Sequence, residues 1–138
     1  MAHVLDTTAL SALMRADGDA SQRLLHLDPN EVTVPQPVLA EVRYGLARLP
    51  KSKRRAKLEE RLEILLSSLE RTPWTDEVSR AFGDLKAELE TRGKRVDDFD
   101  VAIAAHAVAL GATLVTENIR HFERIRGLAI ENWSTEAR

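Results

Sequence analysis

The sequence lacks cysteine altogether, and aromatic side chains make up only 4% of its residues. The absence of cysteine excludes disulfides and thiolate metal sites. The scarcity of aromatic residues argues against a base-stacking platform of the kind that binds single-stranded nucleic acid. No apolar run approaches the roughly 18 residues that a membrane span needs. The N-terminus has neither a basic segment nor a long apolar one, so we expect no secretory signal and a cytoplasmic location.

The chain also lacks a strong charge of either sign, because its formal net charge is −2. It therefore has no overall basic excess of the kind expected for a protein that coats nucleic acid. The length of 138 residues predicts a single domain, residues 1–138, with room for a buried core. Charge is nevertheless uneven, because residues 43–57 contain seven basic side chains and no acidic one. This basic cluster is either a phosphate-binding patch or a solvated loop and helix start.

Short apolar, β-branched runs alternate with longer helical patterns along the chain. This alternation predicts an α/β fold, in which a central, mostly parallel sheet of about five strands lies between helices as a three-layer sandwich. The expected strands are 2–5, 31–34, about 69–72, 112–115 and 128–130. The expected helices begin near Thr7, Gly18, Gln36, Ser52, Asp76 and Phe99, with a short one near Ile119.

Two of these helices follow one another without a clear strand between them, in the segment from Pro35 to Leu69. This arrangement predicts an αα-hairpin that projects beside the sheet and carries the basic cluster near its turn. Leucines spaced three and four residues apart give the second helix of the hairpin one apolar face. We expect that face to pack against another element or against a partner chain.

Acidic residues recur where an apolar run stops or a helix begins. Asp6 follows the first expected strand, Glu41 lies within an apolar helical stretch, Asp100 opens a small apolar helix and Glu117 follows the fourth strand. A carboxylate in such a place is costly unless it is hydrogen-bonded, paired or bound to a cation. The pattern suggests one shared acidic pocket, and oxygen ligands favour Mg²⁺ or Mn²⁺ as its occupant.

Each acid also has a purely structural interpretation. Asp6 can cap the following helix, and acids in the first turn around Asp100 can offset the helix macrodipole. Glu41 can pair with a nearby arginine. The Glu117–Asn118 pair suits a turn, but either residue can also complete the pocket, with Thr116 as a supporting hydroxyl. His121 and its neighbour are expected on the surface.

Taken together, four stretches resemble a PIN domain, and specifically a VapC-type toxin of a bacterial toxin–antitoxin pair. The stretches occur in the family's order and spacing, and the resemblance spans about residues 2–133. It implies a metal-dependent endoribonuclease with a parallel-sheet core. The stretches are residues 4–10, residues 39–45, residues 100–107 and residues 111–122, continued by Gly127-Leu128 and Glu131-Asn132-Trp133.

The resemblance also assigns roles to residues. Asp6, Glu41 and Asp100 match the family's acidic positions and are the expected ligands of Mg²⁺ or Mn²⁺. Many PIN domains have Asp at the fourth catalytic position, where this chain has Asn118, so one firmly held metal is favoured over two. Glu117, its neighbour, is expected to point elsewhere. The residues expected to support these ligands or to contact substrate are Thr7, Thr8, Thr116 and Arg43.

The resemblance further implies an RNA substrate, a cognate antitoxin whose tail fills a groove near the active site, and a homodimer. A metal would polarise the phosphoryl oxygen and lower the pKa of an attacking water, while the basic cluster would hold the RNA backbone. The sequence offers no convincing alternative nucleophile. One alternative is a catalytically degenerate PIN-like binding or regulatory subunit. A receiver-like phosphoacceptor module is disfavoured, because its phosphoacceptor Asp and its Lys are missing from the corresponding strand ends.

Overall fold

The fold was analysed in a computed structural model, which describes residues 2–134. Five strands form one sheet in the order β3-β2-β1-β4-β5, and all four neighbouring pairs are parallel. The strands are β1 (His3–Leu5), β2 (Val32–Pro35), β3 (Glu70–Thr72), β4 (Thr113–Val115) and β5 (Ile130–Glu131). The helices are α1 (Thr7–Met14), α2 (Gly18–Leu25), α3 (Gln36–Ala47), α4 (Lys53–Ser68), α5 (Asp76–Thr91), α6 (Asp98–Leu110) and α7 (Ile119–Phe122), with a 3₁₀ turn at Pro29–Glu31.

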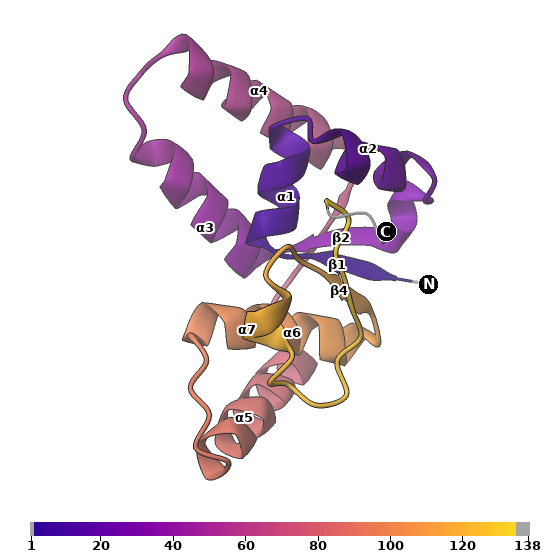
Figure 1. Ribbon diagram of the computed structural model, residues 1–138, viewed down its shortest axis with the longest axis vertical. Coiled ribbons are helices and arrows are strands. Elements are labelled where there is room, and N and C mark those ends of the chain that lie inside the picture. The colour runs from indigo at the N-terminus through magenta and orange to yellow at the C-terminus, as the bar shows by residue number, and fades with distance from the viewer. Residues whose placement is uncertain (1, 135–138) are drawn as a thin grey trace.

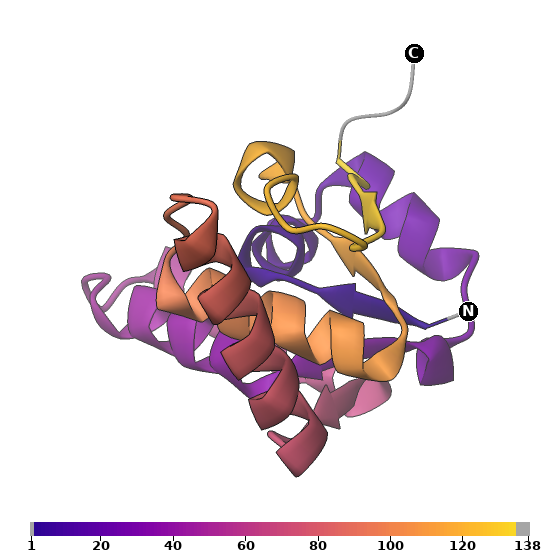
Figure 2. The ribbon, with the colours of Figure 1, turned by 90° about the horizontal axis from the view of Figure 1, so that it is seen from below.

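Helices cover both faces of this sheet, which gives the three layers that the sequence predicts (Figure 2). Helix α6 packs on β1 and β4 and carries α5 on its outer side, while α1 lies on the opposite face with α2, α3 and α4 against it (Figure 1). Strands β1 and β4 are buried on both faces, and their side chains are apolar except for His3 and Thr113. Edge strand β3 is short and exposes Glu70 and Arg71, a composition that discourages pairing with another sheet.

Helix boundaries follow the residue types that the sequence offers. Ser52 caps α4 and Thr75 caps α5, each through its side-chain oxygen. Gly111 ends α6 at a φ of 62°, a left-handed conformation in which a Cβ would be strained. The expected helix starts are confirmed to within a residue. The last strand lies slightly later in the chain than expected, because the pairing with β4 aligns Leu114 with Ile130.

The projecting αα-hairpin is confirmed as α3 and α4, joined by a loop at residues 48–52 (Figure 1). Arg43 on α3 binds Glu63 on α4 at 3.0 Å, and Arg55 donates to the carbonyl of Leu49 at 3.0 Å. The apolar face of α4 packs against α1 of the same chain, where Leu62 is fully buried. The hairpin and α1 therefore form the walls of a space that opens beside the sheet.

Candidate active site

Asp6 is held at the carboxyl end of the sheet by the register of its neighbours. Leu5 pairs with Val115 across the two central strands, and the backbone N–H of Asp6 donates to the carbonyl of Val115 at 2.9 Å. The residues that directly follow the two strands, Asp6 after β1 and Thr116 after β4, therefore lie side by side and form a hydrogen bond. In α/β folds this edge of the sheet is where ligands bind.

Only 3% of the Asp6 residue is exposed, and both of its carboxylate oxygens accept hydrogen bonds. Oδ1 accepts from the Thr8 hydroxyl at 2.7 Å and from the Ala9 N–H at 2.8 Å, and Oδ2 accepts from the Thr116 hydroxyl at 2.5 Å. The bond to Ala9 caps α1, so Asp6 is a cap and a pocket residue at once. Burial raises the pKa of Asp6 above its ordinary value, the three hydrogen bonds oppose this, and the charge of Asp100 raises the pKa further.

Glu41 reaches the same region from α3. Its half-buried carboxylate accepts a hydrogen bond from the Thr7 hydroxyl, the first residue of α1. Burial is the main cause that raises the pKa of Glu41; the Thr7 bond lowers it, and the charges of Asp100 and Asp97 raise it again. The expectation that Glu41 is not freely solvated is confirmed, but its partner is Thr7 rather than an arginine.

Asp100 lies in the first turn of α6, with its side chain 20% exposed. Oδ2 is 3.2 Å from Nδ1 of His121 on α7. Burial raises the pKa of Asp100, the hydrogen bond and charge of His121 lower it, and Asp97 raises it. Because the charge of Asp100 raises the pKa of both Asp6 and Glu41, the three carboxylates from distant segments lie within electrostatic reach of one another.

Known proteins resemble this chain in both sequence and fold. The sequence matches the PIN domain family over residues 3–128. The chain belongs to the PIN domain family. It is 36% identical to Ribonuclease VapC2 of Rickettsia felis, over 96% of this chain and 98% of the relative. The tRNA(fMet)-specific endonuclease VapC of Salmonella typhimurium is 28% identical, over 94% of this chain and 96% of that protein. The fold is also similar to that of a chain in the crystal structure of VapBC2 from Rickettsia felis bound to a DNA fragment from its promoter. The TM-score is 0.86 and the sequence identity 35%, and the alignment covers 96% of this chain and 99% of the other chain.

The threonines expected to support the acids of this PIN domain do so. Thr8 donates to Asp6 and accepts the backbone N–H of Glu117 at 2.8 Å, which ties the loop after β4 to α1. Thr116 donates to Asp6 and accepts the backbone N–H of Asn118 at 2.8 Å. The Glu117 carboxylate points away and lies 4.0 Å from Arg15, as expected. Asn118 precedes α7 with a half-buried side chain that does not cap the helix.

Arg43 stands apart from the acids. Its guanidinium is paired with Glu63 across the hairpin, on an exposed surface. In the structure, Arg43 therefore links α3 to α4. Its proposed contact with substrate stays a prediction.

Two residues of the PIN site were not identified from the sequence. His121 is exposed, as expected, yet its ring contacts Asp100 across a sequence separation of 21 residues. Asp97 caps α6 by accepting the Phe99 N–H at 3.2 Å, and its charge also acts on Glu41 and Asp100. The acid-rich run at residues 97–100 could have indicated Asp97, whereas nothing local to His121 indicates its partner.

The carboxylates fit a divalent cation by their chemistry. They are hard oxygen ligands, they are partly or fully buried, and the charge of Asp100 raises the pKa of the other two, so a cation would offset a real electrostatic cost. Each carboxylate is at present held by its own donors, and no group of three or more acidic or histidine side chains within residues 2–134 is arranged to enclose a metal ion. A metal ion bound by all three carboxylates would therefore require side-chain rotations that turn their oxygens toward a common point.

Thr116 gives a test of how these hydrogen bonds support the site. Thr116→Val keeps the volume but removes the hydroxyl, and leaves Asp6 Oδ2 and the Asn118 N–H without that partner. Because Thr116 is fully buried, we expect a loss of about 1–3 kcal/mol in the free energy of unfolding. Urea unfolding measures it, and Thr116→Ser, which keeps the hydroxyl, is the control. Equal stability of the Val and Ser variants would show that the hydroxyl does not support the site.

Proposed function

We propose that this PIN domain is a metal-dependent endoribonuclease and acts as the toxin of a toxin–antitoxin pair. The observation that carries the proposal is the convergence of Asp6, Glu41 and Asp100, which lie within electrostatic reach at the carboxyl end of the sheet. Two relatives that match this chain over nearly their whole length are named a ribonuclease and a tRNA(fMet)-specific endonuclease. A cytoplasmic location is part of the same proposal, since an RNA substrate would be met there.

Asp6, Glu41 and Asp100 would hold Mg²⁺ or Mn²⁺. Such an ion, when bound, would supply positive charge to a phosphoryl oxygen and would lower the pKa of a water molecule, which is the chemistry that phosphodiester hydrolysis needs. Thr8, Thr116 and the Ala9 N–H fix the orientation of Asp6 more firmly than that of the other two carboxylates. Thr7 orients Glu41, and His121 restrains Asp100. Asn118 adds an amide but no charge beside these groups, which favours one metal over two.

The carboxylates alone would repel RNA, because phosphate and carboxylate carry the same charge. A substrate must therefore be held by cations outside the acidic pocket. The basic cluster of residues 43–57 lies on the hairpin next to Glu41 and supplies them. Contacts of this type fix the position of the backbone and do not read the base sequence.

A cognate antitoxin is the proposed protein partner. The proposal is supported by the similarity to the solved VapBC2 complex of Rickettsia felis and to the DNA-bound VapBC complex of Salmonella typhimurium. A tail that places an arginine among the three carboxylates would be strongly bound, because a desolvated Arg–carboxylate pair is charge-assisted. Such a tail would exclude substrate and metal together.

A homodimer is also proposed. Trp74 and Phe99 are 46% and 43% exposed and, with Phe82 and Pro37, line an apolar pocket of about 440 Å³ between α3, α5 and α6. Exposed apolar patches of this kind mark protein contacts. Sedimentation analysis of the purified protein gives the mass directly.

No described helix is long and apolar enough to cross a membrane.

The function is tested by incubating the purified protein with total RNA and Mg²⁺ or Mn²⁺, and mapping the cut ends. We expect cleavage at a restricted set of positions, which chelation of the metal prevents. A preparation that binds Mn²⁺ but leaves all RNA intact would favour the alternative, a binding or regulatory subunit that retains the PIN fold. The observation that favours this alternative is the neutral Asn118 at the fourth catalytic position.

A further inference from the structure

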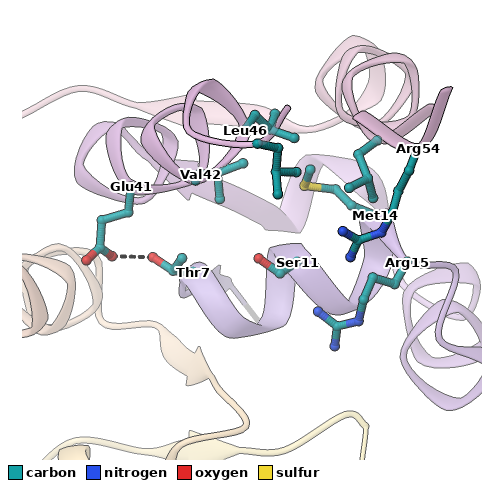
Figure 3. Close-up of a pocket in the computed structure, with 11 residues that line it drawn as sticks. Thr7, Ser11, Met14, Arg15, Glu41, Val42, Leu46 and Arg54 are labelled. Atoms are coloured by element: carbon teal, nitrogen blue, oxygen red, sulfur yellow. Dashed lines mark hydrogen bonds between the residues drawn. The ribbon is translucent and has the colours of Figure 1, made fainter. Parts of the chain in front are cut away.

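A groove runs from the acidic pocket along the inner side of the hairpin. Its first part is a cavity of about 220 Å³ between α1, α3 and α4, with Glu41 and Thr7 at one end and Arg15 and Arg54 at the other (Figure 3). An adjoining cavity of about 270 Å³ shares both arginines and continues to Lys57 and Arg61. The groove thus passes from carboxylate to cation over its length.

The cations of this groove come from two elements. Arg15 follows α1, whereas Arg54, Lys57 and Arg61 lie on α4 at spacings of three and four residues and therefore share one face. From Arg54 to Arg61 this face spans about 10 Å along the helix axis. Figure 3 shows the guanidinium groups of Arg15 and Arg54 extending toward the same space.

Three of these four side chains have no acidic partner in the described part of the chain, and Arg15 has a single one at the limit of ion-pair distance. Arg15 has one acidic neighbour, Glu117 at 4.0 Å, and the described part of the chain contains no ion pair for Arg54, Lys57 or Arg61. Two other basic residues of the hairpin behave differently, because Arg43 binds Glu63 at 3.0 Å and Arg55 binds Glu59 at 3.2 Å. Within the hairpin, Arg43 and Arg55 are thus held by internal ion pairs, whereas Arg54, Lys57 and Arg61 line the groove without such a pair among the described residues.

We propose that Arg15, Arg54, Lys57 and Arg61 bind successive phosphates of the RNA strand on one side of the cleaved bond, along the groove that ends at Glu41. The inference rests on the proposed ribonuclease activity and adds the path that the RNA strand takes away from the acidic pocket. Like charges gathered in one groove are stabilised by an anionic occupant, and a polyanion satisfies several at once. The apolar floor, which includes Met14, Leu46 and Leu58, can face ribose and base carbons of the same strand.

The test measures RNA binding by protein that cannot cleave. In an Asp6→Asn background, binding of bulk bacterial transfer RNA is followed as a function of KCl concentration. Arg54→Gln with Lys57→Gln should weaken binding roughly tenfold or more at 0.1 M salt and reduce the slope of log K against log salt by about 1.5. Arg80→Gln with Lys94→Gln removes the same charge from exposed positions outside both the basic cluster and the groove, and it should leave the slope unchanged. Arg54→Lys, which keeps the charge, should retain most of the RNA affinity and of its salt dependence.

The outcomes separate the inference from the function on which it rests. Equal slopes for the two double variants would overturn the phosphate track, even if the wild-type protein cleaves total RNA. Unchanged RNA binding together with weaker binding of the cognate antitoxin would assign the groove to that protein partner and also overturn it. Failure of the wild-type protein to cleave would reject the proposed function, while the binding slopes would still report whether RNA occupies the groove. Circular dichroism of each variant checks that the exposed substitutions leave the helices intact.

Discussion

Asp6→Asn and Asp100→Asn should each reduce RNA cleavage by more than about 100-fold, because each removes a charged ligand from the proposed metal site. Residues that merely support a metal ligand already change affinity or activity by 10–100-fold, so loss of the ligand itself is expected to exceed that range. Initial rates on the mapped RNA substrate, at saturating Mn²⁺, measure the effect. Loss of toxicity on expression in bacteria is the expected cellular counterpart.

The Asp6→Asn protein should nevertheless stay folded. Its amide oxygen can still accept from Thr8 and from the Ala9 N–H, and the Thr116 hydroxyl can rotate to accept from the new amide N–H. Burial raises the pKa of Asp6, so the charge that the substitution removes is one that folding disfavours. We therefore expect a melting temperature equal to or above that of the wild-type protein without metal.

Asp98→Asn is a matched control for Asp100→Asn. Asp98 lies in the same first turn of α6, but it is exposed and binds Lys86 at 2.9 Å rather than facing the acidic pocket. Its substitution should leave the cleavage rate within about twofold, since an exposed ion pair contributes little. Undiminished metal-dependent cleavage by both Asp6→Asn and Asp100→Asn would sink the assignment of these residues.

Local chemistry made much of the fold predictable. Asp6 and Thr116 each end a buried strand, so a parallel sheet brings them together whatever the details of the loops. Ser52, Thr75 and Gly111 mark helix boundaries through short-range hydrogen bonds and backbone conformation, which depend on a few adjacent residues. For such features the sequence contains the cause as well as the pattern.

The contacts that escaped prediction depend on tertiary arrangement. His121 reaches Asp100 only because α7 turns back over the start of α6, and Thr7 meets Glu41 only because α1 and α3 pack side by side. The basic cluster looks uniform in sequence, yet Arg43 faces α4 and Arg54 faces the groove. Which cation finds an acidic partner is decided by helix packing, and residue order does not specify it.

Manganese should stabilise the protein, and more so as the pH rises. Asp6, Glu41 and Asp100 all have pKa values raised above their ordinary ones, so the folded state binds protons more tightly than the unfolded chain. Their contribution to stability is therefore fully present at acidic pH and is lost as the pH rises through the folded-state pKa values. Mn²⁺ binds the deprotonated carboxylates, so it should restore the stability that is lost.

Thermal unfolding between pH 4.5 and 7.5, with and without Mn²⁺, measures both effects. At a free Mn²⁺ concentration of 100 times Kd the expected gain is about 2.7 kcal/mol near neutral pH. The double variant Asp6→Asn, Asp100→Asn should lose the Mn²⁺ effect and show a flatter pH profile, whereas Asp98→Asn should resemble the wild-type protein. The comparison between variants matters, because other titrating groups contribute equally to each.

The number of Mn²⁺ ions bound per chain tests whether Asn118, in place of a fourth carboxylate, limits the site to one metal ion. Three carboxylates and one neutral amide favour a single Mn²⁺ per chain, because a second dication would lack the charge that a fourth carboxylate provides. Isothermal titration should therefore give a stoichiometry near one, and Asn118→Asp should tighten binding or add a second, weaker ion. If millimolar Mn²⁺ neither binds nor shifts the unfolding of the wild-type protein, the carboxylates are not a metal site. In that case the regulatory alternative explains the chain better than catalysis does.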